Sequence, residues 1–182
     1  FFLFVHYNLI SNNYLSQIKT AQKLLLSEKE PIINLAKTIV EKINGKRIVA
    51  YGDSVFAGVI ERFRQQLNEN SKQLAWHHAL PEMNHNELVG WGGGDDSIAV
   101  LIFRSDFDNP RTKIRMDLSQ KIFKNYTPTV LELNAKGANP IEQAFYHILL
   151  GDWISILLAE SNDVDPVEIK VIEYLKSELA KI

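Results

Sequence analysis

The sequence predicts a three-layer α/β fold, in which a parallel sheet of four or five strands lies between two layers of helices. Four short segments rich in Val, Ile and Leu are spaced along the 182 residues, and longer segments with helical periodicity separate them. No hairpin signal joins any two of these apolar segments. Strands that alternate with helices form parallel sheets, because each helix returns the chain to the same edge. The length suits a single domain with its own core.

The first half of the chain is expected to contain two helices and two strands. An amphipathic pattern predicts a helix over residues 31–44, and the apolar run RIVAY predicts a strand over 47–51. A turn at 52–54 opens a second helix, which carries Glu69 at its end. The segment 73–80 is short and apolar enough to be a buried strand.

The second half is expected to continue the alternation. The run SIAVLIF predicts a strand over 97–103, a helix is expected over 110–123, and TPTVLEL predicts a strand over 127–133. Two further helices are predicted to begin at Asn139 and at Asp165, because each of these capping residues is followed by Pro and then by an acidic residue.

The composition excludes several classes of function. A formal net charge of −2 leaves no polybasic surface for nucleic acid. The absence of Cys excludes disulfides and thiolate metal sites, which fits a cytoplasmic protein. The opening run FFLFVHYNLI is too short for a membrane span and lacks the features of a signal peptide. We interpret it as a helix that packs on an upstream part of a longer protein.

The stretch from Asn68 to Trp91 carries the side chains with the most distinctive chemistry. Glu69 lies at the end of a predicted helix, and His85 follows a turn or helix start at Pro81. The helix dipole at these two places favours the neutral forms of both groups, as suits groups that exchange protons. We expect a helix end, a strand and a helix start to bring them to one crevice. The alternative is that Glu69 is solvated and His85 caps a turn.

Two strings in this stretch, NENSK and LPEMNHNELVGW, resemble the second half of the bifunctional phosphoglucose/phosphomannose isomerases. That family has the sugar isomerase (SIS) fold, a flavodoxin-like arrangement. In the family, the Glu of the NEN element is the catalytic base and the His of the HN element helps to open the sugar ring. These residues match Glu69 and His85, which lie 16 positions apart.

The resemblance implies an aldose–ketose isomerase that interconverts glucose 6-phosphate and fructose 6-phosphate. Mannose 6-phosphate would be a second substrate. Such an enzyme needs no cofactor. The resemblance also implies a homodimer, because His85 would serve the partner's site. It further implies that residues 1–182 form a single C-terminal SIS domain. Family members that accept both epimers carry a Thr shortly before a C-terminal Lys, whereas residues 164–175 contain no Ser or Thr. This sequence therefore departs from the pattern that accompanies dual specificity in the family.

Lys176 matches the C-terminal Lys that enters the active site in that family. On the predicted last helix it lies on the apolar face with Ile172 and Leu179. A lysine in that position either extends its amine to water or reaches into a site. The candidate catalytic residues are therefore Glu69, His85 and Lys176.

The candidate substrate-binding residues are Gly52, Ser54 and Asn70. A turn between strand and helix can bind a phosphate on free N–H groups, but here it holds one Gly and the acidic Asp53, so this interpretation is the less favoured one. The glycine run at 92–94 matches no phosphate-binding motif and is expected to be a flexible loop.

Two alternatives belong to other classes of function. A metal site is disfavoured, because the adjacent His77 and His78 point to opposite faces of a strand; the cluster considered comprises His77, His78, Glu82, His85 and Glu87. The second alternative is a non-catalytic SIS module that binds a sugar phosphate for regulation. Such a module would not need the set of Glu, His and Lys.

Overall fold

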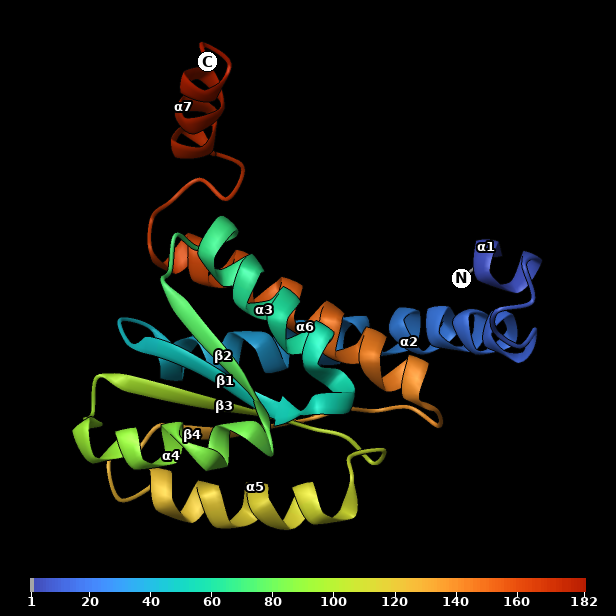
Figure 1. The fold of residues 1–182 in the computed structure, drawn as a ribbon, viewed down its shortest axis with the longest axis horizontal. Helices are drawn as coiled ribbons and strands as arrows, with labels where there is room; N and C mark the ends of the chain where they lie inside the picture. The colour runs from blue at the N-terminus through green and yellow to red at the C-terminus, as the bar shows by residue number, and fades with distance from the viewer. Residues whose placement is uncertain (1) are drawn as a thin grey trace.

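The four apolar segments form one parallel sheet at the centre of the molecule, with strand order β2-β1-β3-β4 (Figure 1). The computed structural model describes residues 2–182. The strands are β1 (Arg47–Asp53), β2 (Ala75–Leu80), β3 (Ile98–Arg104) and β4 (Val130–Asn134). All three neighbouring pairs are parallel, which confirms the predicted α/β fold.

Helices cover both faces of this sheet. The helices of the described chain are α1 (Phe2–His6), α2 (Asn13–Ile43), α3 (Ala57–Asn70), α4 (Glu87–Gly90), α5 (Pro110–Phe123), α6 (Pro140–Ser161) and α7 (Lys170–Leu179), and α1 and α7 have no buried residue. Single 3₁₀ turns lie at Ser54–Phe56, Glu82–His85 and Trp91–Gly93. α2, α3 and α6 pack on one face, and α5 with the short α4 lies on the other (Figure 1).

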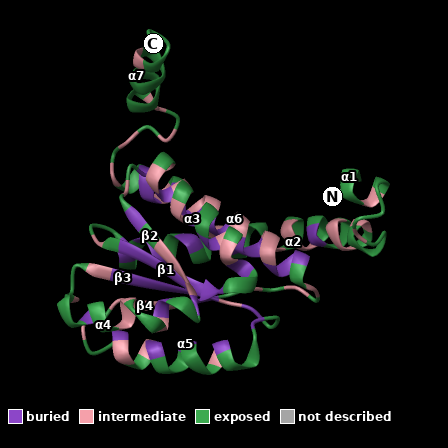
Figure 2. Cartoon of the chain, in the orientation of Figure 1, coloured by how far each residue is buried: buried purple, intermediate pink, exposed green. Residues whose placement is uncertain are grey.

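Alternate residues of each strand point to the two faces and build two separate cores. In β1, Ile48 and Ala50 pack against α2, α3 and α6, whereas Val49 and Tyr51 face α5. β1 and β3 lie in the middle of the sheet and are buried on both sides (Figure 2). Near-continuous apolar runs are what a strand covered on both faces requires.

The helix predicted over 31–44 is only the last part of α2, which begins at Asn13 with Pro31 inside it. Pro31 is a start signal in the sequence, because Pro is favoured in the first turn of a helix. The buried side chains of Ala21 and Ile32, one on each side of the proline, show that packing holds both halves. Packing therefore compensates for the hydrogen bond that the proline removes.

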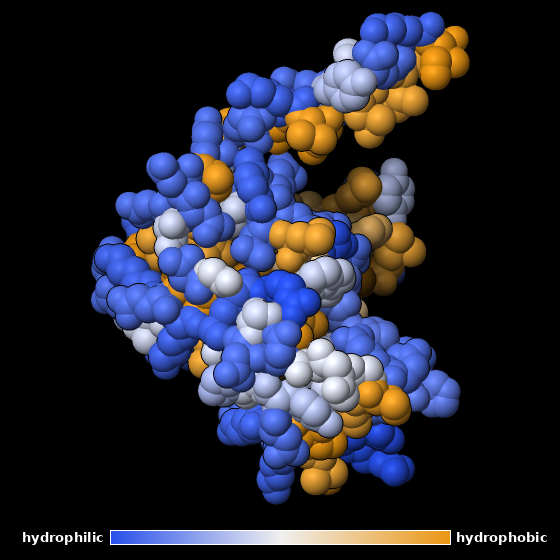
Figure 3. All heavy atoms as spheres, turned by 90° about the vertical axis from the view of Figure 1, so that its left-hand side faces the viewer, coloured by the Kyte–Doolittle hydropathy of each residue, from blue (hydrophilic) through white to orange (hydrophobic). Residues whose placement is uncertain are grey.

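The last helix begins at Lys170 and not at Asp165, so that prediction was wrong. The Asp165 carboxylate instead accepts the N–H of Val167 at 2.9 Å and closes a turn. α7 has no buried residue and stands out from the body, with hydrophobic side chains gathered along one side of it (Figures 1 and 3). A capping signal decides where a turn forms, but a helix is stabilised over its length mainly by packing.

Within residues 2–182, none of the helices has the combination of length and apolar character that crossing a membrane requires.

Candidate active site

Glu69 lies in the last turn of α3, with its side chain exposed. It lines a groove of about 400 Å³ between the end of α3 and the segment that leads into α7. The other lining residues are Asn68, Lys72, Leu74 and Glu168 to Ile172. A carboxylate at the rim of an open groove can approach a small ligand without any change in the backbone.

Hydrogen bonds to α6 fix the backbone that follows Glu69. The Asn70 amide donates to Ser155 Oγ at 2.9 Å, and Ser71 Oγ donates to the Ser155 carbonyl at 2.7 Å. The Asn162 amide donates to the Ser71 carbonyl at 3.0 Å. These side-chain hydrogen bonds join segments that are far apart in the sequence. They give Asn70 a structural role, and a contact between Asn70 and substrate stays a prediction.

Lys72 completes the turn after α3. Its φ of 52° lies in the left-handed region, where a residue ends a helix. Its Nζ donates to the carbonyl of Glu69 at 2.6 Å. Asn68 Oδ1 accepts the N–H of Ala75 at 2.9 Å, which joins the end of α3 to the start of β2. The Glu69 backbone is therefore braced from both sides.

His85 ends the 3₁₀ turn Glu82–His85, beyond the carboxyl end of β2, and its side chain is exposed. Glu69 precedes the amino end of the same strand. β2 has six residues, and at a rise of about 3.3 Å per residue it separates the two by roughly 17–20 Å. Our expectation that the two side chains share one crevice is wrong for a single chain. A strand is extended, so the residues that flank it lie at opposite edges of the sheet.

Lys176 lies in the middle of α7 and is exposed. The first turn of α7, with Lys170 and Ile172, lines the Glu69 groove, but Lys176 does not. Four residues of helix, about 6 Å, separate Lys176 from Ile172. Lys176 thus lies in the helix that borders the Glu69 groove but does not line the groove itself.

At the turn of Gly52 and Ser54, the space and the N–H groups that a phosphate would use are taken by side chains of the protein. A Cβ on Gly52 would lie 2.5 Å from Ile60 Cδ1, so this glycine lets β1 and α3 approach closely. The buried Asp53 carboxylate accepts the N–H groups of Val55 at 3.0 Å and Asn109 at 2.8 Å. A buried carboxylate that already fills the turn opposes phosphate binding there. The substrate contacts predicted for Gly52 and Ser54 therefore gain no support from the geometry.

In residues 2–182, no group of three or more His, Asp or Glu side chains is arranged to hold a metal ion. His77 and His78 point to opposite sides of β2, as their adjacency predicts. Burial lowers the pKa of His77, and the nearby Arg64 adds to this effect. His78 Nδ1 instead lies 2.6 Å from Glu87 Oε2.

Sequence reasoning did not identify a polar network on the other face of the sheet. The Tyr51 hydroxyl donates to Glu87 Oε1 and accepts from Trp91 Nε1 at 3.1 Å, and His78 contacts the second Glu87 oxygen. Burial, reinforced by the Glu87 carboxylate, raises the pKa of Tyr51. The alternation along β2 was the available signal, because it puts Trp76 and His78 on the face of Tyr51.

In a comparison with known protein families, residues 32–179 match the model of the bacterial phospho-glucose isomerase C-terminal SIS domain. The chain is similar to the bifunctional phosphoglucose/phosphomannose isomerase of Aquifex aeolicus, with 34% identity over 167 residues, which are 91% of this chain and 52% of that protein. The enzyme of the same name from Thermoplasma volcanium is 35% identical over 160 residues, 86% of this chain and 51% of that protein. The chain therefore spans about half the length of the curated relatives it matches.

Solved structures agree on the fold. A glucose-6-phosphate isomerase like protein from Thermus thermophilus superposes with a TM-score of 0.67 at 20% identity, over 91% of this chain and 56% of that chain. Tagatose-6-phosphate ketose/aldose isomerase from Escherichia coli gives a TM-score of 0.57 at 15% identity, over 86% of this chain and 45% of that chain. At these identities the likeness concerns the arrangement of strands and helices.

Proposed function

The chain belongs to the bacterial phosphoglucose isomerase C-terminal SIS domain family, and from this premise we propose that it supplies the catalytic base of an aldose–ketose isomerase. The substrates would be glucose 6-phosphate, with mannose 6-phosphate as the second candidate, and fructose 6-phosphate. The observation that carries the proposal is the position of Glu69, an exposed carboxylate on a braced backbone at the rim of a groove.

The proposed reaction moves one proton between neighbouring carbons. In the open-chain aldose, the Glu69 carboxylate removes the proton from C2, and the C1 carbonyl oxygen takes up a proton from water to give an enediol. The Glu69 carboxylic acid then returns its proton to C1, while the O2 hydroxyl releases its proton to water and becomes the carbonyl of the ketose, so atoms and charge balance without a cofactor. One carboxylate can reach both carbons if its backbone stays fixed, and the hydrogen bonds of Asn70 and Ser71 to α6 supply that rigidity.

His85 would act on the ring oxygen in the opening step, as an imidazole suits general acid–base work. Since roughly 17–20 Å of strand separates it from Glu69 in one chain, it would do so in the site of a second subunit. The site then needs a dimer, with Glu69 of one subunit facing His85 of the other across a two-fold axis. Lys176 would approach the ring or the phosphate by a shift of α7, which has no buried residue to hold it.

The test of the base uses the full-length protein with Glu69→Gln, which keeps the size of the side chain but cannot accept the proton. We expect kcat to fall by about 10²–10⁴-fold, the contribution of one general base, with little change in KM. The assay follows fructose 6-phosphate conversion to each epimer, with solvent deuterium appearing at C2. Glu61→Gln, on the exposed part of the same helix, is the matched control. Unchanged turnover in Glu69→Gln would place the base elsewhere.

The shared site has a separate test. Glu69→Gln and His85→Ala subunits, each inactive alone, are unfolded together and refolded as a mixture. If His85 serves the partner's site, about half of the dimers contain both variants and each of these has one native site. The mixture should recover about a quarter of wild-type activity. No recovery, or a strict monomer in light scattering, would contradict the shared site while leaving the role of Glu69 open.

A further inference from the structure

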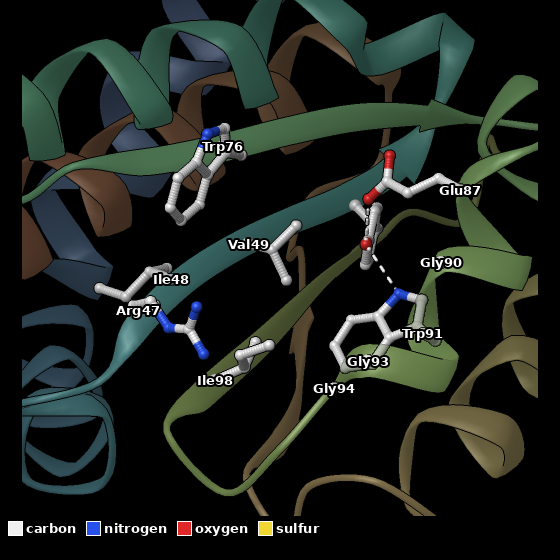
Figure 4. Close-up of a pocket in the computed structure, with 11 residues that line it drawn as sticks. Arg47, Ile48, Val49, Trp76, Glu87, Gly90, Trp91, Gly93, Gly94 and Ile98 are labelled. Atoms are coloured by element: carbon white, nitrogen blue, oxygen red, sulfur yellow. Dashed lines mark hydrogen bonds between the residues drawn. The ribbon is translucent and has the colours of Figure 1, made fainter.

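A second pocket, of about 260 Å³, lies at a corner of the sheet, and no residue of α5 lines it. Val49 and Ile98 form its floor, and Trp76 and Trp91 lie on either side of Val49 (Figure 4). Its lining residues and those of the Glu69 groove are entirely different. Trp76 is 49% exposed although Val49, its partner on β1, is buried, so a large aromatic surface remains open to a ligand.

One end of this aromatic pocket carries a carboxylate that is already oriented. Glu87 Oε1 accepts the Tyr51 hydroxyl, and Oε2 lies 2.6 Å from His78 Nδ1. Trp91 Nε1 donates to the Tyr51 hydroxyl at 3.1 Å, which fixes the indole wall relative to the acid. Each carboxylate oxygen retains a second lone pair for a further donor. The acid is thus held by Tyr51 on β1 and His78 on β2 before any ligand arrives.

Two charged residues of the described chain line the pocket, Arg47 at one end and Glu87 at the other. Among the described residues that line it, the one cation is Arg47 at the opposite end, which pairs with Asp95 at 3.2 Å and donates to Ser97 Oγ at 2.6 Å. Asp95 therefore balances the Arg47 charge, and Glu87 keeps its negative charge uncompensated when its neighbour His78 is neutral. Aromatic faces beside a carboxylate are the combination that attracts a cation, through the ring quadrupole and a charge-assisted hydrogen bond together.

We propose that this pocket binds a small planar ring that carries an amine or amidine cation. The ring would lie over Val49 between Trp76 and Trp91, and its nitrogen would donate to Glu87. The volume suits a single ring rather than a larger ligand. This site is independent of the isomerase reaction.

A second protein chain is the less favoured occupant of this corner. The cores of protein interfaces are depleted in charged residues, whereas here an ionisable pair of Glu87 and His78 borders the pocket. The pocket is also concave, as small-molecule sites are. The experiment below distinguishes the two occupants.

The test uses benzamidine, a planar amidinium, and benzamide, its neutral counterpart of the same shape, with the full-length protein in calorimetric titrations. We expect saturable benzamidine binding at one site per chain and about 10- to 100-fold weaker binding of benzamide, the effect of losing one charge-assisted hydrogen bond. Glu87→Gln should reduce benzamidine affinity by a similar factor. Glu82→Gln, an exposed carboxylate that does not line the pocket, is the matched control.

Because Glu87 also accepts from the buried Tyr51, a second variant protects the test against misfolding. Trp76→Ala removes an exposed side chain and should weaken benzamidine binding at least tenfold while leaving the circular dichroism spectrum unchanged. Absence of saturable binding, or binding that both variants retain, would overturn the proposal. A change of oligomeric mass in Trp76→Ala would also overturn it, in favour of a protein interface.

Discussion

His147 gives the most direct link between burial and a measurable property of this fold. It lies in α6 with 1% of its surface exposed, and its Nε2–H donates to the carbonyl of Arg104 at 3.0 Å. Its ring packs on Phe103, with the two ring centroids 5.0 Å apart. No partner for Nδ1 is present among residues 2–182. Burial lowers the pKa of His147 from 6.5 to about 4, because an apolar surrounding disfavours the charged ring.

This difference predicts how the stability of the protein depends on pH. The folded-state pKa is depressed, so the unfolded chain binds a proton that the folded chain rejects between pH 6.5 and pH 4. The stabilisation is complete above pH 6.5 and is lost as pH falls through that range. At about 1.36 kcal/mol for each pH unit, the loss from this residue amounts to about 3 kcal/mol at pH 4.

The measurement is urea unfolding of wild type and His147→Gln at pH 7 and pH 4. The Gln amide can still donate to the Arg104 carbonyl but does not titrate. We expect the decrease in unfolding free energy between the two pH values to be about 3 kcal/mol smaller in the variant than in wild type. His6→Gln, at the exposed end of α1, should behave as wild type. An equal decrease in wild type and His147→Gln would refute the reasoning.

Two further changes test the loop and cap that start α6. Gly137→Ala should lower the unfolding free energy by about 2–4 kcal/mol, since φ is +139° and the new Cβ would lie 2.5 Å from Glu142 Cβ. Gly45→Ala, at φ +74° with open space around it, should lower the unfolding free energy by only about 1 kcal/mol. If urea unfolding gave equal losses for Gly137→Ala and Gly45→Ala, this account would be contradicted. Asn139→Ala removes the side chain that accepts the Glu142 N–H at 3.0 Å and should cost about 1 kcal/mol, whereas an unchanged unfolding midpoint would show that the cap is dispensable.

The strands were the most predictable part of the fold. Runs such as 97–103 are apolar at nearly every position, because the sheet is covered on both faces, and β3 indeed spans Ile98–Arg104. The helix predicted over 110–123 has the bounds of α5, since Asn109 caps it and Pro110 opens it. Local signals suffice where capping and packing agree.

The elements that were misplaced depend on tertiary packing. The first part of α2 lies N-terminal to Pro31, where a local rule would end or start a helix, and only its buried contacts explain its continuation. The start of α7 was misjudged for the opposite reason. Asp165 and Pro166 form a capping signal, but this segment closes only a turn, and the helix that follows has no buried residue.

Sequence reasoning named the candidate residues, and their roles stay predictions, whereas the structure corrects how two of them are arranged within one chain. The spacing of Glu69 and His85 indicates that a strand lies between them. The extension of that strand, which the prediction did not take into account, keeps the two residues apart in a single chain. The aromatic pocket was missed because its walls come from Tyr51, Trp76 and Trp91. These are distant in the sequence. The register of β1 and β2 pairs Val49 with Trp76 and Tyr51 with His78, which puts Tyr51 and Trp76 on the same face of the sheet.

The hydrogen bonds between the end of α3 and α6 also constrain how this sequence can diverge. Asn70 donates to the hydroxyl of Ser155, a residue 85 positions away, and Ser71 donates to its carbonyl. Loss of the Ser155 hydroxyl would leave the half-buried Asn70 amide without its acceptor, whereas compensating substitutions at both positions could preserve the hydrogen bond. Positions 70 and 155 are thus expected to change together in related sequences. A substitution in the middle of α6 could also displace Glu69 although it does not contact Glu69.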